Sequence, residues 1–256
     1  MQAMCPAPAA WADMAVFNLM IAGRVGTVHS LFESTKDYCG RYLTAAPGEF
    51  TVEVTKADLL AQQEALLEEA RQEGIRKRIF TDPFLERTAI QEAFADHLFH
   101  HDILLCHGST VAVDGRAYLF TARCGTGKST HTRLWRQVFG DRAQMVNDDK
   151  PFLKLTDSGV LACGAPWSGK HGLDANITVP LGGICILERG PENTIQPITP
   201  AEALPRLLHE TYCPAGQAEQ FEKLVTRLAE TVPLWRMACT KDPQAAQVAF
   251  NAMSTE

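Results

Sequence analysis

The sequence lacks the charge pattern of a nucleic-acid-binding protein. Its 256 residues contain 24 Lys and Arg against 30 Asp and Glu, a formal net charge of −6, and the basic residues are dispersed along the chain. Nucleic-acid-binding proteins usually gather such residues into a stripe that neutralises the phosphate backbone. We therefore expect no nucleic acid among the partners of this chain.

Long hydrophobic runs are also missing. The most apolar segments, such as residues 184–187, have the length of a strand, whereas a helix needs roughly 20 apolar residues to cross a bilayer. Residues 1–6 show neither the positive end nor the apolar run of a signal peptide. These absences predict a cytoplasmic protein without a membrane partner.

The eight cysteines show no repeated Cys-x-x-Cys pattern, so the sequence predicts neither a zinc site nor a disulfide framework. Cys106, Cys163 and Cys185 lie in apolar runs, where a cysteine behaves as a small buried hydrophobic residue. Cys124 differs because it lies in a glycine-rich segment. We expect the thiols to be reduced.

The apolar residues that are present, 46% of the chain with its Tyr included, follow an α/β pattern. Residues 1–100 are predicted to form a small N-terminal α/β region with helices at about 57–73 and 82–99, and residues 101–256 to form the main domain. Its strands are expected near residues 103–106, 111–113, 117–120, 144–146, 152–155, 160–162, 184–187 and 234–239. Further helices are expected to begin near residues 199 and 242, where a cap precedes a proline.

A phosphate-binding pattern stands between the strand predicted at 117–120 and a helix that would follow. It reads Ala122-Arg123-Cys124-Gly125-Thr126-Gly127-Lys128-Ser129-Thr130. Backbone amides in such a loop curl around an anion, and the helix directs its positive end at it. Lys128 is predicted to reach the phosphates, and the Ser129 hydroxyl to ligate Mg²⁺. Residues 124–130 are therefore candidate nucleotide ligands, although Ala122 replaces the first glycine of the pattern. The alternative is an ordinary glycine-rich turn before a helix.

Two adjacent carboxylates, Asp148 and Asp149, follow the strand predicted at 144–146. Two neighbouring anions in an enclosed site repel each other and favour a nearby cation. In phosphoryl transfer, one such carboxylate can hold the metal ion while the other accepts the proton of the attacking hydroxyl. The alternative is a surface turn capped by aspartates.

Other candidates surround these motifs. His107 follows the strand predicted at 103–106, although a lone histidine is often structural. The glycine-rich loop 163–172 can grip a substrate anion, or it can simply connect two strands. Arg189 ends the strand predicted at 184–187, either as a phosphate ligand or in a solvated charge pair. The candidates for substrate binding are Trp167, Lys170, His171 and Arg189.

The order of His107-Gly108, the loop 125–129 and the pair Asp148-Asp149 resembles the HPr kinase/phosphorylase group, which is related to phosphoenolpyruvate carboxykinases. The resemblance covers residues 103 to about 190. It implies a P-loop core with a mixed sheet, followed by C-terminal helices, and ATP and Mg²⁺ as ligands.

The resemblance also implies roles for individual residues. Lys128 and Ser129 would bind the nucleotide phosphates and Mg²⁺, Asp148 would bind the metal ion through water, and Asp149 would be the general base. His107 would join Lys128 and Asp149 in catalysis.

The expected activity is ATP-dependent transfer of the γ-phosphate to a hydroxyl of a small metabolite, an amino acid or a peptide. Thr130 stands where HPr kinases typically carry glutamate, and the Trp167 loop replaces their arginine-containing signature. These departures favour an acceptor other than HPr. The alternatives are an HPr-type protein serine kinase/phosphorylase and a nucleotide-binding regulatory protein without catalysis. The sequence is compatible with an oligomer.

Overall fold

The computed structural model describes residues 14–72, 80–169 and 171–254. The chain divides into two compact units: the first contains residues up to 19 and 25–90, and the second contains residues 20–24 and those from 91 onward. The domain boundary predicted near residue 100 stays a prediction, since α3 (Asp82–Phe99) runs from one unit into the other. No helix in the described part of the chain is long and apolar enough to cross a membrane.

The first unit contains a small sheet of order β1-β2-β3, in which β3 runs parallel to β2. The elements up to α3 are β1 (Ala15–Ile21), β2 (Arg24–Ser30), α1 (Glu33–Tyr38), a 3₁₀ turn (Gly40–Tyr42), β3 (Phe50–Glu53) and α2 (Lys56–Gln72). The helix predicted at 57–73 is confirmed, and its start is the capping box of Thr55 with Asp58: the Asp58 carboxylate accepts the Thr55 amide at 2.7 Å.

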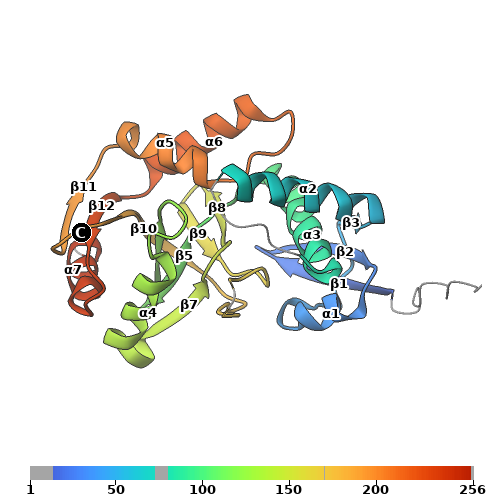
Figure 1. The fold of residues 1–256 in the computed structure, drawn as a ribbon, viewed down its shortest axis with the longest axis horizontal. Coiled ribbons are helices and arrows are strands. Elements are labelled where there is room, and N and C mark those ends of the chain that lie inside the picture. Colours follow the sequence, from blue (N-terminus) through green and yellow to red (C-terminus); the bar gives the residue numbers. More distant parts are fainter. Residues whose placement is uncertain (1–13, 73–79, 170, 255–256) are drawn as a thin grey trace, which may run out of the picture. The chain divides into compact units, whose positions relative to one another are not determined.

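The second unit is built on a mixed sheet whose described strands follow the order β4-β8-β9-β10-β6-β5-β7, with β12 beside β10 and β11 beside β12. Figure 1 labels most of these strands. Its strands are β4 (Ile103–Leu105), β5 (Ser109–Val113), β6 (Arg116–Thr121), β7 (Ala143–Asn147), β8 (Phe152–Thr156), β9 (Gly159–Cys163), β10 (Thr178–Arg189), β11 (Thr194–Pro197) and β12 (Leu234–Cys239). Its helices after α3 are α4 (Lys128–Phe139), α5 (Pro200–Glu210), α6 (Ala218–Thr231) and α7 (Gln244–Met253), with a 3₁₀ turn at Gly140–Arg142. The α/β class predicted from the sequence is confirmed.

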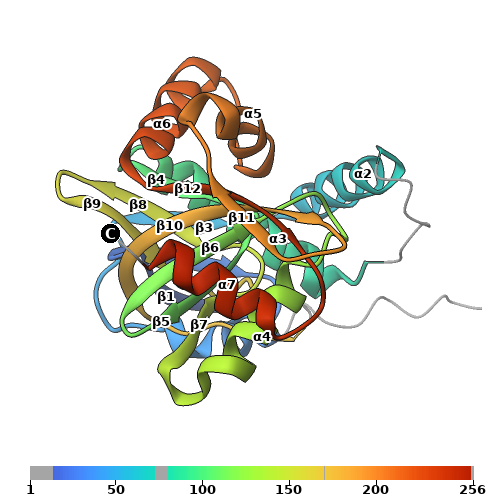
Figure 2. The ribbon, with the colours of Figure 1, turned by 90° about the vertical axis from the view of Figure 1, so that its left-hand side faces the viewer.

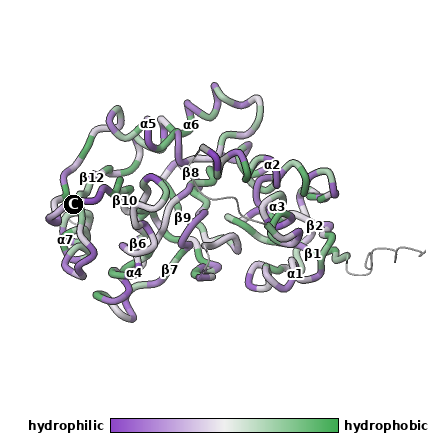
Figure 3. The backbone as a smooth tube through the Cα atoms, viewed as in Figure 1, coloured by the Kyte–Doolittle hydropathy of each residue, from purple (hydrophilic) through white to green (hydrophobic). Residues whose placement is uncertain are grey.

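Helices cover both faces of this sheet. Figure 2 shows α5 and α6 above the strands, α7 in front of them and α4 toward the bottom. The upper core joins α5 and α6 to apolar residues of β4, β6, β9 and β10, and the lower core joins α4 and α7 to the opposite faces of β5, β6, β10 and β12. Along α6 the buried residues recur at helical spacing: Phe221, Leu224, Val225, Leu228 and Ala229. Figure 3 shows both hydrophobic and hydrophilic residues along this helix.

Local signals account for several joints. The predicted Asp114-Gly115 hairpin turn connects β5 to β6, and both residues have positive φ, 52° and 79°, as a two-residue turn of this kind requires. The capping box predicted at the start of α5 is also present, with Thr199 and Glu202 each bonded to the other's backbone amide. Cys106, Cys163 and Cys185 are buried as predicted, and burial raises the pKa of each thiol.

Candidate functional site

The register of three strands brings the predicted motifs to one edge of the sheet. β5 pairs antiparallel with both β6 and β7, so β6 and β7 run in the same direction and end beside the start of β5. Ser109 is registered with Phe120, and Thr110 with Asn147. The segment before β5, the loop after β6 and the aspartates after β7 therefore converge.

Two glycines of the loop between β6 and α4 adopt a backbone conformation that favours glycine. Gly125 and Gly127 have φ values of 74° and 125°, a region that residues with a Cβ seldom adopt. Ala122, which replaces the first glycine, is buried and does not lie in that region, so its methyl group meets no backbone strain. The predicted strand–turn–helix context is present, and Gly140 ends the helix with a φ of 52°. Cys124, Gly125 and Ser129 are exposed, whereas Thr126, Gly127 and Thr130 are half-buried.

The side chains of Lys128 and Arg189 donate hydrogen bonds to carbonyls of this loop. The Lys128 ammonium donates to the Ala122 carbonyl at 3.0 Å, across the base of the loop. Burial lowers the pKa of Lys128, whereas the carboxylates of Glu210 and Asp149 act in the opposite direction. Arg189, at the end of β10, donates to the Gly125 carbonyl at 2.5 Å and approaches the Thr126 carbonyl at 3.5 Å. Arg189, a candidate for binding phosphate or substrate, therefore contacts the loop directly.

Asn147 fixes the turn that carries the two aspartates. Its side chain is 0% exposed. The Asn147 Oδ1 accepts the backbone amides of Asp149 at 2.9 Å and Lys150 at 2.7 Å. Its Nδ2 donates to the carbonyls of Ala165 at 2.8 Å and Trp167 at 3.2 Å. One buried amide therefore ties the aspartate turn to the glycine-rich loop.

The two aspartates have different surroundings. Asp148 is buried and its Oδ1 accepts the Gly169 amide at 2.9 Å. Burial raises the pKa of Asp148 and Asp149 adds to the rise, while the Gly169 amide and the charges of His171 and Arg136 lower it. The side chain of Asp149 is 39% exposed. The carboxylate of Asp148 is thus fixed by the Gly169 amide, whereas the carboxylate of Asp149 is accessible to solvent.

Close approach explains two glycines of the loop 163–172. A Cβ on Gly164 would lie 1.8 Å from the Ala175 carbonyl oxygen, and one on Gly169 would lie 2.4 Å from Oδ1 of Asp148. Glycine at these positions lets one backbone pass close to another and lets an amide reach the buried carboxylate. Gly169 therefore lets the loop lie close to Asp148, and Gly164 lets it lie close to Ala175.

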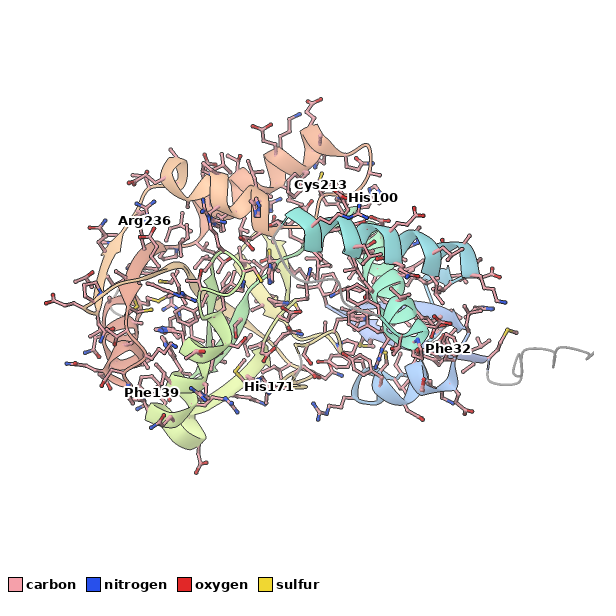
Figure 4. The ribbon with its side chains drawn as sticks, viewed as in Figure 1. Phe32, His100, Phe139, His171, Cys213 and Arg236 are labelled. Carbon is pink, nitrogen blue, oxygen red and sulfur yellow. The ribbon has the colours of Figure 1, made fainter. Side chains whose placement is uncertain are left out.

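The substrate-binding candidates of this loop have different placements. The Trp167 ring is 5% exposed and packs against Phe94 and Phe152, with centroid distances of 5.6 Å and 6.3 Å. It lies in the interior, where it anchors the loop. His171, labelled in Figure 4, is exposed and close enough to Asp148 to lower its pKa. Lys170 lies outside the described residues.

His107 lies between two carboxylates. Its Nε2 is 3.6 Å from Oδ1 of Asp149, and its Nδ1 is 3.0 Å from Oε2 of Glu210 at the end of α5. The next residue, Gly108, donates its amide to the Asp149 carbonyl at 2.9 Å, and a Cβ there would lie 2.7 Å from a Leu119 methyl group. The chain thus places the predicted catalytic residues His107 and Asp149 side by side.

Glu210 and Asn147 are parts of this site that no sequence motif identified. Glu210 lies far from the other site residues in the sequence, within an amphipathic helix where glutamate is common. The signal for Asn147 was its place directly before the aspartates, but its role depends on carbonyls from a separate loop.

The oxygen-rich donor set suits Mg²⁺. Among the described residues, no group of three or more His, Cys, Asp and Glu side chains could hold a metal ion by itself. Mg²⁺ usually takes one or two carboxylates, several waters and the phosphates of its substrate. Asp148, a buried carboxylate, and Ser129, an exposed hydroxyl, are donors of the type that this arrangement takes from the protein.

Comparison with known proteins leaves the family of the chain open. No family model matches the sequence, and no curated protein matches it. Among solved structures, the Hpr(Ser) kinase/phosphatase from Coxiella burnetii matches with 13% identity and a TM-score of 0.35, over 58% of this chain and 95% of that one.

Proposed function

We propose that the chain is an ATP-dependent phosphotransferase that moves the γ-phosphate to a hydroxyl of a small metabolite, an amino acid or a peptide. The observation that carries the proposal is the convergence of the loop 122–130 and Asp149 at one edge of the sheet, where the charge of Asp149 raises the pKa of Lys128 against the effect of burial. A phosphate grip alone would suit any nucleotide-binding protein. An accessible carboxylate held beside it suits a transferase.

In this proposal the loop amides and Lys128 bind and orient the nucleotide phosphates, and Arg189 holds the loop through its carbonyls. Asp148 and Ser129 would hold Mg²⁺, which neutralises charge on the phosphates when bound. Asp149 accepts the proton of the acceptor hydroxyl while the hydroxyl oxygen forms a bond to the γ-phosphorus. The bond to the bridging oxygen breaks and ADP leaves. Because the Lys128 ammonium is held on the loop, it stabilises the negative charge that develops at the phosphates.

His171 contacts the acceptor in this proposal, because it is exposed and its charge acts on Asp148. Trp167 supports that loop from within.

The test is to incubate the purified protein with Mg-ATP and a panel of hydroxyl metabolites, amino acids and peptides, following ADP release and labelled phosphate. Asp149→Asn should abolish transfer while leaving ATP affinity within about twofold, because the amide keeps the shape of the carboxylate but accepts no proton. Asp157→Asn, at an exposed turn between β8 and β9, is the matched control and should transfer normally. Undiminished transfer by Asp149→Asn would refute the assigned base. ATP binding without transfer to any acceptor would favour the regulatory alternative.

A further inference from the structure

Glu210 is a buried carboxylate that the proposed transfer does not use. Only 6% of the residue is exposed. A carboxylate is seldom buried unless it is paired, because taking its charge out of water is costly. Its partners therefore indicate its role.

Both carboxylate oxygens of Glu210 are paired. Oε2 lies 3.0 Å from Nδ1 of His107, whereas Oε1 lies 2.9 Å from Arg206, one turn back on α5, and 3.3 Å from the exposed His209. Burial raises the pKa of Glu210, but the hydrogen bond and charge of His107, with Arg206 and Lys128, outweigh burial and lower the pKa to about 2. Glu210 is thus an anion at neutral pH and holds the imidazole nitrogen that faces away from Asp149.

The backbone sets the same register. The His107 amide donates to the Glu210 carbonyl at 2.6 Å, and the Tyr212 amide donates to the Leu105 carbonyl at 2.9 Å. Between them, Cys106 and Thr211 form an antiparallel bridge, and their side chains approach at 3.5 Å. The segment after α5 is therefore joined to the segment that carries His107, and the two side chains meet in a preset geometry.

We propose that Glu210 is a positioning residue for the phosphotransfer: it binds the Nδ1–H of His107 and thereby presents Nε2 to the carboxylate of Asp149. This inference rests on the proposed function. A histidine whose Nδ1–H is held by a buried carboxylate keeps one ring orientation, which is how an orienting carboxylate supports a catalytic imidazole. Because an ionised carboxylate only accepts hydrogen bonds, Nε2 serves Asp149 as an N–H donor. Without Glu210 the ring can rotate, and Nε2 no longer faces Asp149.

The first experiment compares Glu210→Leu, which removes the acceptor, with Glu210→Gln, which keeps an acceptor oxygen. Glu210→Leu should lower kcat roughly tenfold or more with a smaller change in KM for ATP, since Glu210 also acts on the charge of Lys128, and Glu210→Gln should restore part of the loss in kcat. Glu219→Gln, in an exposed pair with Lys223 at 2.6 Å, is the matched control and should leave kcat unchanged. An unchanged kcat in Glu210→Leu would overturn the proposal. Should the leucine variant fail to fold, Glu210→Gln provides the comparison.

A double-mutant cycle separates positioning from general support of the fold. Because Glu210 is proposed to act through His107, changing Glu210 in a His107→Ala background should cause no further loss of kcat. A loss of equal size in both backgrounds would show that Glu210 acts independently of His107 and would refute the positioning role.

A spectroscopic readout keeps this inference separate from the proposed function. In the full chain labelled with ¹⁵N-histidine, His107 should carry a proton on Nδ1 in the wild type, and Glu210→Gln should shift that resonance. A bare Nδ1 in the wild type would overturn the inference. If the wild type transfers no phosphate, the proposed function fails, and the His107 resonance still decides whether Glu210 holds the imidazole.

Discussion

Replacing Asn147 with alanine should both destabilise the protein and stop phosphate transfer. Among the described residues, the side chain donates two hydrogen bonds and accepts two, all with backbone groups, from a position that is 0% exposed. A hydrogen bond contributes about 0.5–1.5 kcal/mol net, and a buried group left unpaired costs about 1–3 kcal/mol. Water can enter part of the space left by the amide, so we expect a loss of about 4 kcal/mol.

That loss corresponds to a fall in Tm of roughly 8–16 °C for a unit of this size. Thermal unfolding of the wild type, Asn147→Ala and the exposed control Asn251→Ala measures it, and the control should move by less than about 2 °C. At temperatures where Asn147→Ala is folded, ATP should still bind while transfer is lost, because Oδ1 holds the Asp149 amide. A fall in Tm as small as that of the control, with normal transfer, would refute the structural role given to Asn147.

Two further predictions concern packing and pH. Gly164→Ala should lower stability by roughly 1–3 kcal/mol or more in urea unfolding, since its Cβ would lie 1.8 Å from a backbone oxygen; Gly40→Ala, with nothing within 4 Å, is the control, and equal effects would contradict the packing argument. Burial lowers the pKa of His131 from its ordinary 6.5 to about 4. The folded protein therefore favours the neutral imidazole at this position. The resulting stability is present above pH 6.5 and lost as the pH falls to 4, by roughly 3 kcal/mol. In His131→Gln, the free energy of unfolding measured in urea should change less between pH 6.5 and 4 than in the wild type. The same pH dependence in both proteins would refute the role given to His131.

Local signals in the sequence predicted much of the second unit. The strand, glycine-rich turn and helix around residues 117–139, the Asp114-Gly115 hairpin and the capping box at Thr199 all depend on neighbouring residues, and the structure contains each of them. These features are readable because short-range hydrogen bonds and backbone preferences decide them.

Elements without such signals were missed or shortened. Helix α6 begins at Ala218, and its N-cap residue Gln217 makes no side-chain cap, so nothing in the sequence marked its start. β10 extends over Thr178–Arg189 although only 184–187 was predicted, because Pro180 and two glycines interrupt its apolar pattern. β11 is a short, mostly exposed strand that pairs only with β12 among the described strands, and it has no buried face to produce alternation.

The site was predictable only as separate motifs. Their convergence depends on the antiparallel pairing of β5 with both neighbours, and the partners Glu210 and Asn147 act through tertiary contacts that no local pattern encodes. The position of the Trp167 ring also depends on tertiary contacts. An aromatic residue in a glycine-rich loop favoured a substrate contact, but its ring packs on Phe94 and Phe152 because the loop folds back over the core.

The most direct test of the account is the affinity of the protein for Mg-ATP, measured by isothermal titration calorimetry with the wild type and Lys128→Ala. If the loop 122–130 grips the nucleotide phosphates, losing the ammonium should weaken binding about tenfold or more, or at least about 1.4 kcal/mol. Lys223→Ala, at an exposed position on α6, should bind as the wild type does. Equal affinity in the wild type and Lys128→Ala, or no ATP binding at all, would contradict the assignment of the loop.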